Sequence, residues 1–515
     1  MSTHNFCKKN ILAVVLSAAS IIVIIPYIVV LVKSFGLYPY TCMDSAIILS
    51  EMERIAEGWI PYHQMHLNYP PLWFYFMASL KKVFHIPYGC YSFYLIIQYI
   101  FLSGSAWMLY KFNKLYCTSQ PVLWASVLYF LFMTFLYRAF FVIFEPISIF
   151  FGLTALYLTL TPSIRKSAYR YIFVGLLSSG AFLIKQFGLG FCLLNILLIL
   201  LNPSFEEQDE YKVSTVLGRL MSFSIGLLIP IFLCRLYFGD LFWEAVLFNG
   251  YGTTVNASIG DDVSFGSKIV FVLVQLSKFL FFQCPIVILI VFTLRKVINT
   301  EQWKIVLLAF CGIIGFAFQY YFSKYTNSPH YNQYMMPFVC MLIPVIAQWA
   351  HSNIRLRKLL CIALLGISVL YAGESVLGKK HKYSPSVMKQ DVAEGECGIS
   401  TDTQTSSERI VIETTGNSVY ERIHNIVPKD KTLWIPNTSL LKYWIKTNRL
   451  PPNMKEIGYS TGTSELTPEK AERQINDADF ILCQEGDAWD TMLSSKSINC
   501  FLIDSRRRLF LHEMP

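Results

Sequence analysis

The sequence predicts a polytopic α-helical membrane protein with a small α/β domain at its C-terminal end. The 515 residues are 54% hydrophobic and only 15% charged, which differs from the usual mix of a soluble domain. Many apolar runs are long enough to cross a membrane. Near residue 374 the composition changes abruptly to charged and polar residues. We therefore predict a membrane domain over 1–373 and a separate domain over 374–515.

A spanning helix needs about 20 apolar residues, and a bundle tolerates shorter ones. On this measure the chain has about eleven crossings. They lie near residues 11–32, 90–110, 121–137, 147–161, 170–184, 187–201, 219–237, 269–294, 304–322, 336–350 and 358–373. The first run follows Lys8 and Lys9 and is longer than a signal-peptide core, so we expect it to remain as a transmembrane helix.

Basic residues lie in alternate loops, as the positive-inside rule requires if the N-terminus is cytoplasmic. The outer loops are then 33–89, 138–146, a hairpin at Lys185, 238–268 and 323–335. An odd number of crossings puts the C-terminal domain outside the cytoplasm. The basic residues behind the net charge of +9 thus orient the protein in the membrane. They form no continuous basic face of the kind that binds a nucleic acid.

The polar tail alternates helix and strand signals. Thr467-Pro468-Glu469 is typical of a helix start, and the segments DFILC, CFLID and RLFLH are typical of short buried strands. Cys483 and Cys500 fall on two of these strands, where a disulfide is conceivable but not specified by the sequence. The tail is therefore predicted to be an α/β domain with no assigned role.

The first outer loop, 33–89, is the most informative stretch. Apolar residues recur at helical spacing beside acidic and basic ones, which predicts an amphipathic helix in the membrane interface. Asp44 stands at its start and Gly58 ends it. Pro70 and Pro71 then hold the chain extended until a second helix begins near Leu72.

The chain resembles a known family at these positions. An Asp just beyond the first crossing, followed by EGWIPYHQMHLNYPPLWFYFMASL, is similar to the protein O-mannosyltransferase and lipid A aminoarabinose transferase group, glycosyltransferase family 39 of the GT-C fold. Further segments fit the family's second acidic site, its cationic residue and its His/Tyr cluster. These segments are Glu145-Pro146, FLIKQFG around Lys185, and HYNQYMMP. The resemblance covers most of the membrane region, up to about residue 350.

The resemblance implies sugar transfer from a polyprenyl-phosphate donor to a glycan, lipid or protein acceptor at the outer membrane face. In an inverting single displacement, the acceptor hydroxyl needs a general base, for which we choose Asp44. The leaving phosphate gains from a fixed cation, and Lys185, Arg138 and His330 are candidates. The family often has two adjacent acids where this chain has Asp44-Ser45, so Glu145 is the candidate second carboxylate.

Two more aromatic residues complete the predicted substrate site, Tyr69 and Tyr331. Each candidate also has a structural interpretation. Asp44 fits a helix N-cap, Glu145 a helix-start carboxylate, and Lys185 a lysine that extends to the interface. His330 and Tyr331 fit an interfacial belt equally well.

Two other functions stay open. A polysaccharide polymerase or ligase that acts on lipid-linked oligosaccharide also needs charged outer loops, although it has no reason to carry an acid at position 44. A transporter is disfavoured because no inverted hydropathy halves are evident. No metal-ligand spacing is present, so we predict no metal and no cofactor. Neither the sugar nor the acceptor follows from the sequence.

Overall fold

The structure, a computed structural model, describes residues 3–35, 43–63, 67, 69–86, 91–139, 142–161, 167–201, 213–243, 246, 265–283, 286–291, 302–322, 329–351, 411–413, 419–428, 431–435, 478–484, 493, 497–504 and 509–515. The chain divides into two compact units. The first comprises Met1–Gly36, Tyr69–Trp73 and Ser92–Ser375, and the second comprises Leu37–Asn68, Phe74–Tyr91 and Val376–Pro515. The boundary predicted near residue 373 lies outside the described residues and stays a prediction.

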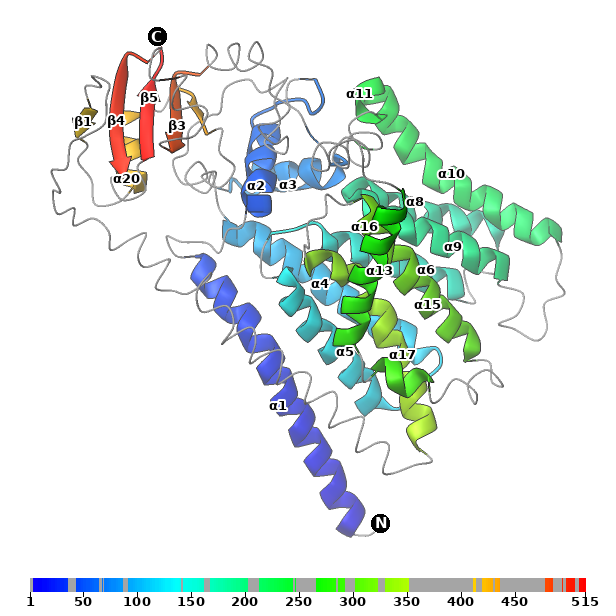
Figure 1. The fold of residues 1–515 in the computed structure, drawn as a ribbon. Coiled ribbons are helices and arrows are strands. Elements are labelled where there is room, and N and C mark those ends of the chain that lie inside the picture. Colours follow the sequence, from blue (N-terminus) through cyan, green and yellow to red (C-terminus); the bar gives the residue numbers. More distant parts are fainter. Residues whose placement is uncertain are drawn as a thin grey trace. The chain divides into compact units, whose positions relative to one another are not determined.

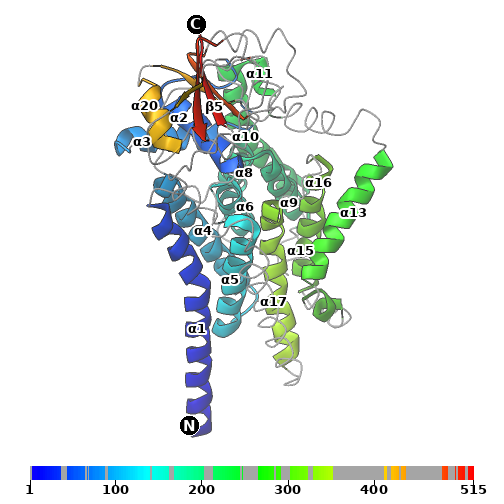
Figure 2. The same cartoon turned by 60° about the vertical axis from the view of Figure 1, so that its left-hand side comes forward.

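The first unit is a bundle of helices (Figure 1). Its longer helices are α1 (Thr3–Ser34), α4 (Tyr91–Lys114), α5 (Gln120–Thr134), α6 (Glu145–Leu160), α8 (Tyr171–Ile184), α9 (Leu189–Leu201), α10 (Val213–Phe238), α13 (Phe265–Phe282), α15 (Trp303–Ala317) and α17 (Met336–His351). Short helical turns lie between them: η1 (Phe135–Ala139), η2 (Ala168–Arg170), η3 (Gln186–Gly188), α11 (Asp240–Trp243), α16 (Gln319–Phe322) and η6 (Pro329–Tyr334). Figure 2 shows the same bundle turned by 60°.

Small residues let some of these helices approach closely. On α8, a Cβ added to Gly175 would overlap the backbone carbonyl of Phe223 on α10. On α10, a Cβ added to Gly226 would likewise overlap the carbonyl of Ile172. Glycine at both positions therefore allows the backbone contact that joins α8 to α10, a common device in helix bundles.

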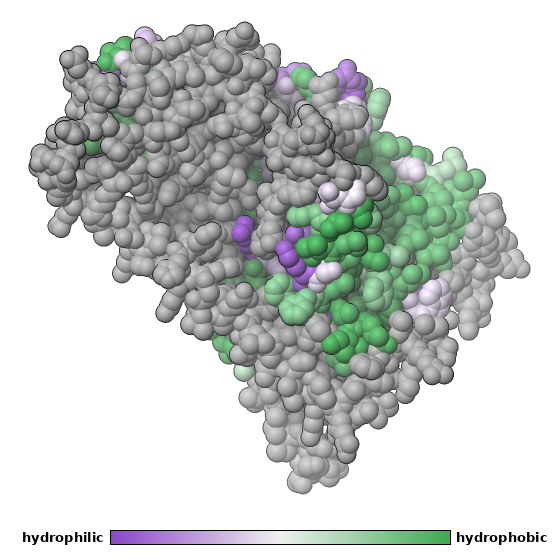
Figure 3. Space-filling view, viewed as in Figure 1, coloured by the Kyte–Doolittle hydropathy of each residue, from purple (hydrophilic) through white to green (hydrophobic). Residues whose placement is uncertain are grey.

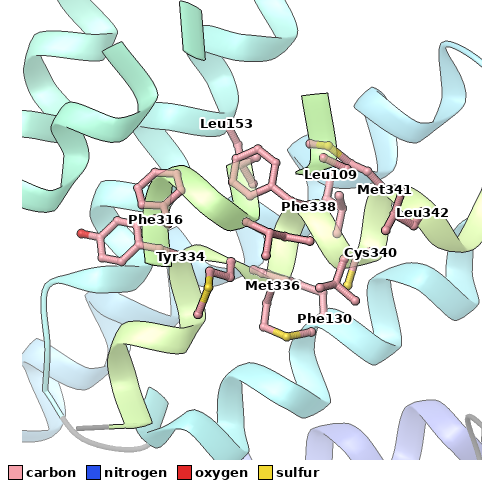
Figure 4. Close-up of a cluster of buried hydrophobic side chains, with 14 of the residues drawn as sticks. Leu109, Phe130, Leu153, Phe316, Tyr334, Met336, Phe338, Cys340, Met341 and Leu342 are labelled. Carbon is pink, nitrogen blue, oxygen red and sulfur yellow. The ribbon is translucent and has the colours of Figure 1, made fainter. Parts of the chain in front are cut away.

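The core of the bundle joins α4, α5, α6, α9, α15 and α17. Figure 4 shows part of this core, and its ten labelled side chains come from five of these helices and from η6. Phe316 of α15 and Tyr334 of η6 stack with their ring centroids 5.1 Å apart. Aromatic and aliphatic packing thus fixes the position of η6, which carries two of the predicted site residues.

An exposed apolar surface lies along α10. Six of its apolar side chains are exposed at helical spacing: Leu217, Met221, Ile225, Leu228, Phe232 and Leu236. The hydrophobic surface in Figure 3 lies over the helices of this unit. Among the described residues, three helical segments are long and apolar enough to cross a membrane: Tyr91–Lys114, Gln120–Ala139 and Thr215–Phe238. Six shorter apolar helices accompany them.

Helices lie within each of the first ten predicted spans, but in the eighth, 269–294, α13 already ends at Phe282. The eleventh, 358–373, lies outside the described residues. The break predicted at Lys185 between the fifth and sixth spans is confirmed as a helix end, because α8 stops at Ile184 and α9 starts at Leu189. The predicted number of crossings and their orientation stay predictions.

In the second unit, α2 (Met43–Ala56) forms where an amphipathic helix was predicted. Its apolar residues from Ile48 to Ala56 are buried, but Glu51, Glu53 and Arg54 are buried as well. Glu53 pairs with Lys81 of α3 (Leu72–Val83), and the Arg54 guanidinium lies 5.6 Å from the Trp59 ring centroid. The charged side of α2 is thus not a solvated face, because these partners cover it.

A five-stranded sheet completes the second unit. Its strands are β1 (Val411–Glu413), β2 (Leu433–Trp434), β3 (Phe480–Gln484), β4 (Asn499–Asp504) and β5 (Leu509–Glu513), in the order β1-β4-β5-β3-β2, with α20 (Val419–Ile426) between β1 and β2. The outer pairs are parallel, and β5 is antiparallel to both β3 and β4. The three predicted strands are confirmed, and the helix predicted from Thr467 lies outside the described residues.

Cys483 and Cys500 are both buried. They belong to β3 and β4, which β5 separates, and they are aligned with different residues of β5, Phe510 and His512, so their Cα atoms are more than two strand spacings, about 9–10 Å, apart. A disulfide requires Cα atoms within about 7 Å. The two cysteines are therefore core residues of the sheet.

Candidate functional site

A buried ion pair lies at the centre of the candidate site. Lys185 Nζ is 2.7 Å from Glu145 Oε1, and the two side chains are 6% and 0% exposed. Burying two charges is unfavourable unless they compensate each other, and removal of one partner from such a pair is strongly destabilising. The pairing explains how a lysine is accommodated among apolar helices.

Local backbone geometry places both members of the pair. Lys185 is extended and ends α8, and η3 follows it directly. The Gly188 amide donates to the Lys185 carbonyl at 2.8 Å, and a Cβ at Gly188 would overlap the Ala181 carbonyl. Only glycine therefore fits this tight turn. Glu145 stands in the first turn of α6, where the free amides of a helix N-terminus favour a carboxylate.

His330 is the second cationic candidate near Glu145. Its Nε2 lies 3.7 Å from Glu145 Oε1, and its side chain is 7% exposed. The neighbouring Tyr331 ring meets the His330 ring edge to face, with centroids 4.4 Å apart. Both residues belong to η6. Glu145 thus faces two basic side chains from two separate elements.

Four aromatic rings surround the Lys185 ammonium. It lies 5.2 Å from the centroid of Tyr331, 5.4 Å from Tyr69, 5.5 Å from Phe144 and 5.9 Å from Phe187. Rings at this range attract a cation and exclude water. We call Lys185 and these four rings the lysine cage. Phe144 and Phe187 were not predicted, although each lies next to or close to a predicted charged residue in sequence.

A buried glutamine supports the segment before Glu145. Gln98 of α4 donates to the Ala139 carbonyl at 2.9 Å and accepts from the Ile143 amide at 2.8 Å. Ser105, also on α4, donates to the Pro146 carbonyl at 3.2 Å. The sequence held a signal for this role, since Gln98 is a polar residue inside a predicted span. Its polarity alone does not reveal which backbone groups Gln98 binds, so the sequence did not predict this role.

Arg138 has a strained backbone. It is the fourth residue of η1, a single π-helical turn, and has φ 71° and ψ 22°, a region that disfavours side chains with a Cβ. Its side chain is half-buried and has no ion pair or hydrogen bond within the described part of the chain. Gln333 of η6 donates to the adjacent Tyr137 carbonyl at 2.7 Å, which ties η1 to η6.

Asp44 is the second residue of α2, so its backbone lies at a helix start as predicted. Its side chain lies outside the described residues, and its role as a base stays a prediction. Another acid of α2 is described, because burial raises the pKa of Glu51 to about 8 while nearby Arg54 opposes the rise. Glu51 Oε2 has no hydrogen-bond partner among the described residues.

The structure brings together Glu145, Lys185, His330, Tyr331 and Tyr69. Tyr69 belongs to the same unit as the other four and contacts Phe144, with ring centroids 4.8 Å apart. No group of three or more His, Cys, Asp and Glu side chains arranged to hold a metal ion occurs in the described ranges. The predicted lack of a metal requirement stays a prediction.

No protein-family model matches the chain, and no curated protein matches it. Among solved structures, the crystal structure of the Archaeoglobus fulgidus oligosaccharyltransferase in complex with Zn and sulfate is similar to this chain. The similarity covers 90% of this chain and 68% of that chain, with 11% identical residues and a TM-score of 0.41. A similarity of this size establishes neither the fold nor the activity of this chain.

Proposed function

We propose that this protein transfers a sugar from a polyprenyl-phosphate donor to an acceptor at the outer face of the membrane. The observation that supports this proposal most is that the residues of the lysine cage and Glu145 come from four separate segments of the chain. Residue 69, residues 144–145, residue 185 and residues 330–331 each belong to a different predicted outer loop, and Phe187 begins the predicted span after Lys185. Loops assigned to one side from charge alone thus supply residues to a single site, which supports placing that site at that side.

The charges of the site suit a leaving phosphate. In the proposed reaction the acceptor oxygen attacks the anomeric carbon while Asp44 takes its proton. The bond between that carbon and the phosphate oxygen breaks, and the phosphate leaves with the electron pair. A lipid phosphate is a weak base, so it needs no proton but is stabilised by a nearby cation. Lys185, Arg138 and His330 are the candidates for this cation, and the resemblance to family 39 supports the donor class.

The test incubates purified protein with a panel of radiolabelled polyprenyl-phosphate sugars and detects labelled acceptor. Lys185→Met, compared as folded protein, should weaken donor binding and slow transfer, whereas Lys185→Arg should keep part of both, because arginine keeps the charge but not the shape. Lys268→Met is the matched control, since Lys268 lies over the Tyr321 ring at 5.6 Å but outside the site. Transfer that is equal in the Lys185→Met and Lys268→Met variants would contradict the assignment.

A further inference from the structure

Lys185 is already neutralised before any substrate binds. Its ammonium is 2.7 Å from Glu145 Oε1, and both side chains are almost fully buried. A phosphate oxygen that approaches Lys185 must therefore compete with a carboxylate for the same ammonium hydrogens. The Lys185 cation that the proposed reaction requires is thus already paired with the Glu145 carboxylate.

Glu145 keeps other support if Lys185 turns away. Its carboxylate stands in the first turn of α6 and lies 3.7 Å from His330 Nε2. Its second oxygen, Oε2, is buried without a hydrogen-bond partner among the residues described. A carboxylate with a free oxygen, a helix N-terminus and a second basic group nearby can lose one partner without being left isolated.

The lysine cage gives Lys185 a similar freedom. Four aromatic rings at 5.2 to 5.9 Å attract the ammonium from several directions and fix no single orientation. A lysine ammonium is also a compact charge with three rotatable donors. Lys185 can therefore redirect its hydrogens without leaving the cage.

We propose that Glu145 is an exchangeable counter-ion that holds Lys185 until a lipid phosphate displaces it, and that recaptures Lys185 when the phosphate product leaves. This inference rests on the proposed function. The donor is a phosphodiester that carries one negative charge. The released lipid phosphate is a monoester that carries about two negative charges near neutral pH. A free lysine would therefore hold the product more tightly than the donor. Competition from Glu145 counteracts this product inhibition.

Farnesyl phosphate, a short prenyl monoester, serves as the probe, with farnesol as the uncharged control. Glu145→Gln keeps the shape of the side chain but removes the competing charge. We expect this variant to bind farnesyl phosphate about tenfold more tightly than the wild type, because the phosphate no longer shares the ammonium. Farnesol affinity should not change. Adding Lys185→Met to Glu145→Gln should abolish the gain.

A second variant covers the case in which Glu145→Gln does not fold, since it leaves Lys185 without its counter-ion. Glu145→Asp keeps the charge but withdraws it from Lys185 by one methylene group. We expect a smaller gain in farnesyl phosphate affinity than for Glu145→Gln, again with no change for farnesol. A purely structural pair predicts no gain for either variant.

Each outcome decides a separate point. Unchanged or weaker farnesyl phosphate binding by the folded variants overturns the counter-ion role, and the proposed function stands if the wild type still transfers a lipid-linked sugar. Tighter binding by the variants, with no transfer by the wild type from any donor in the panel, keeps the counter-ion role and overturns the proposed function. Absence of farnesyl phosphate binding by the wild type and by every variant overturns the counter-ion role as well.

Discussion

Gln98 accepts a hydrogen bond from the Ile143 amide at 2.8 Å, and so fixes the backbone two residues before Glu145. Gln98→Leu would leave the Ile143 amide and the Ala139 carbonyl without this partner in a buried site. Each unpaired group costs about 1–3 kcal/mol of folding free energy. We expect a lower unfolding temperature in detergent and weaker donor binding, since Glu145 would be less well positioned.

The control for Gln98 is Gln120, an exposed residue that accepts a hydrogen bond from Tyr110 at 2.8 Å. Gln120→Leu should change stability by no more than about 0.5 kcal/mol, as is usual for surface positions. Equal unfolding temperatures for the two variants would show that Gln98 does not support the Glu145 segment.

Asp44→Asn tests the proposed base. Asparagine keeps the size of the side chain and caps a helix almost as well, but it cannot take a proton. Transfer should fall by roughly 10²- to 10⁴-fold with donor binding nearly intact, the range that general-base catalysis supplies. Glu57→Gln, at an exposed residue just after the end of α2, is the control. Near-normal turnover by Asp44→Asn, measured with the true donor and acceptor, would refute the role.

Arg138→Gly separates strain from function. Glycine relieves a left-handed backbone that disfavours other residues by roughly 1–2 kcal/mol. We therefore expect an unchanged or higher unfolding temperature. If Arg138 binds the donor phosphate, the same variant should lose about 10- to 100-fold in affinity for a lipid phosphate, as expected for a charged hydrogen bond.

His85 is the matched control for Arg138, because it is exposed, has φ 50° and lies outside the site. His85→Gly relieves the same kind of strain and should leave lipid phosphate affinity unchanged. Full affinity in Arg138→Gly would mean that Arg138 has no part in donor binding.

Glu51 gives the second unit a pH-dependent stability. Burial raises its pKa from the ordinary 4.5 to about 8, so between these values the folded protein binds a proton that the unfolded chain releases. Stability contributed by this group is therefore lost as pH rises through that window, by at most about 1.4 kcal/mol per pH unit. Glu51→Gln should stabilise the protein relative to the wild type at pH 8 and much less at pH 5.

Thermal unfolding of Glu51→Gln, Glu57→Gln and the wild type at several pH values checks this expectation. Glu57 is exposed, so its variant should follow the wild type across the range. A constant difference between Glu51→Gln and the wild type from pH 5 to pH 8 would exclude a raised pKa for Glu51.

Much of the architecture follows from the order of apolar runs, because length and hydropathy are local properties. The helix break at Lys185 and the strands at DFILC, CFLID and RLFLH were predictable for this reason. The lysine cage was predicted only in part, because Lys185, Tyr69 and Tyr331 were named from the sequence and Phe144 and Phe187 were not. In sequence, Phe144 and Phe187 resemble dozens of other aromatic residues in the chain. Only the packing of the helices places these two beside Lys185. The burial of Glu51 and Arg54 was also beyond the sequence, since helical spacing assigns them to a polar face and cannot reveal what covers it.

The sheet has a consequence for biosynthesis. β5 is the central strand and joins β3 to β4, yet it follows all of its partners along the chain. Until Leu509–Glu513 are synthesised, β3 and β4 each expose a strand edge, and such edges readily pair with other chains. The two halves of the sheet can combine only after β5 is complete. Expression and quality control of this unit are thus most sensitive to its final strand, and truncation before Leu509 should yield aggregation rather than a smaller folded unit.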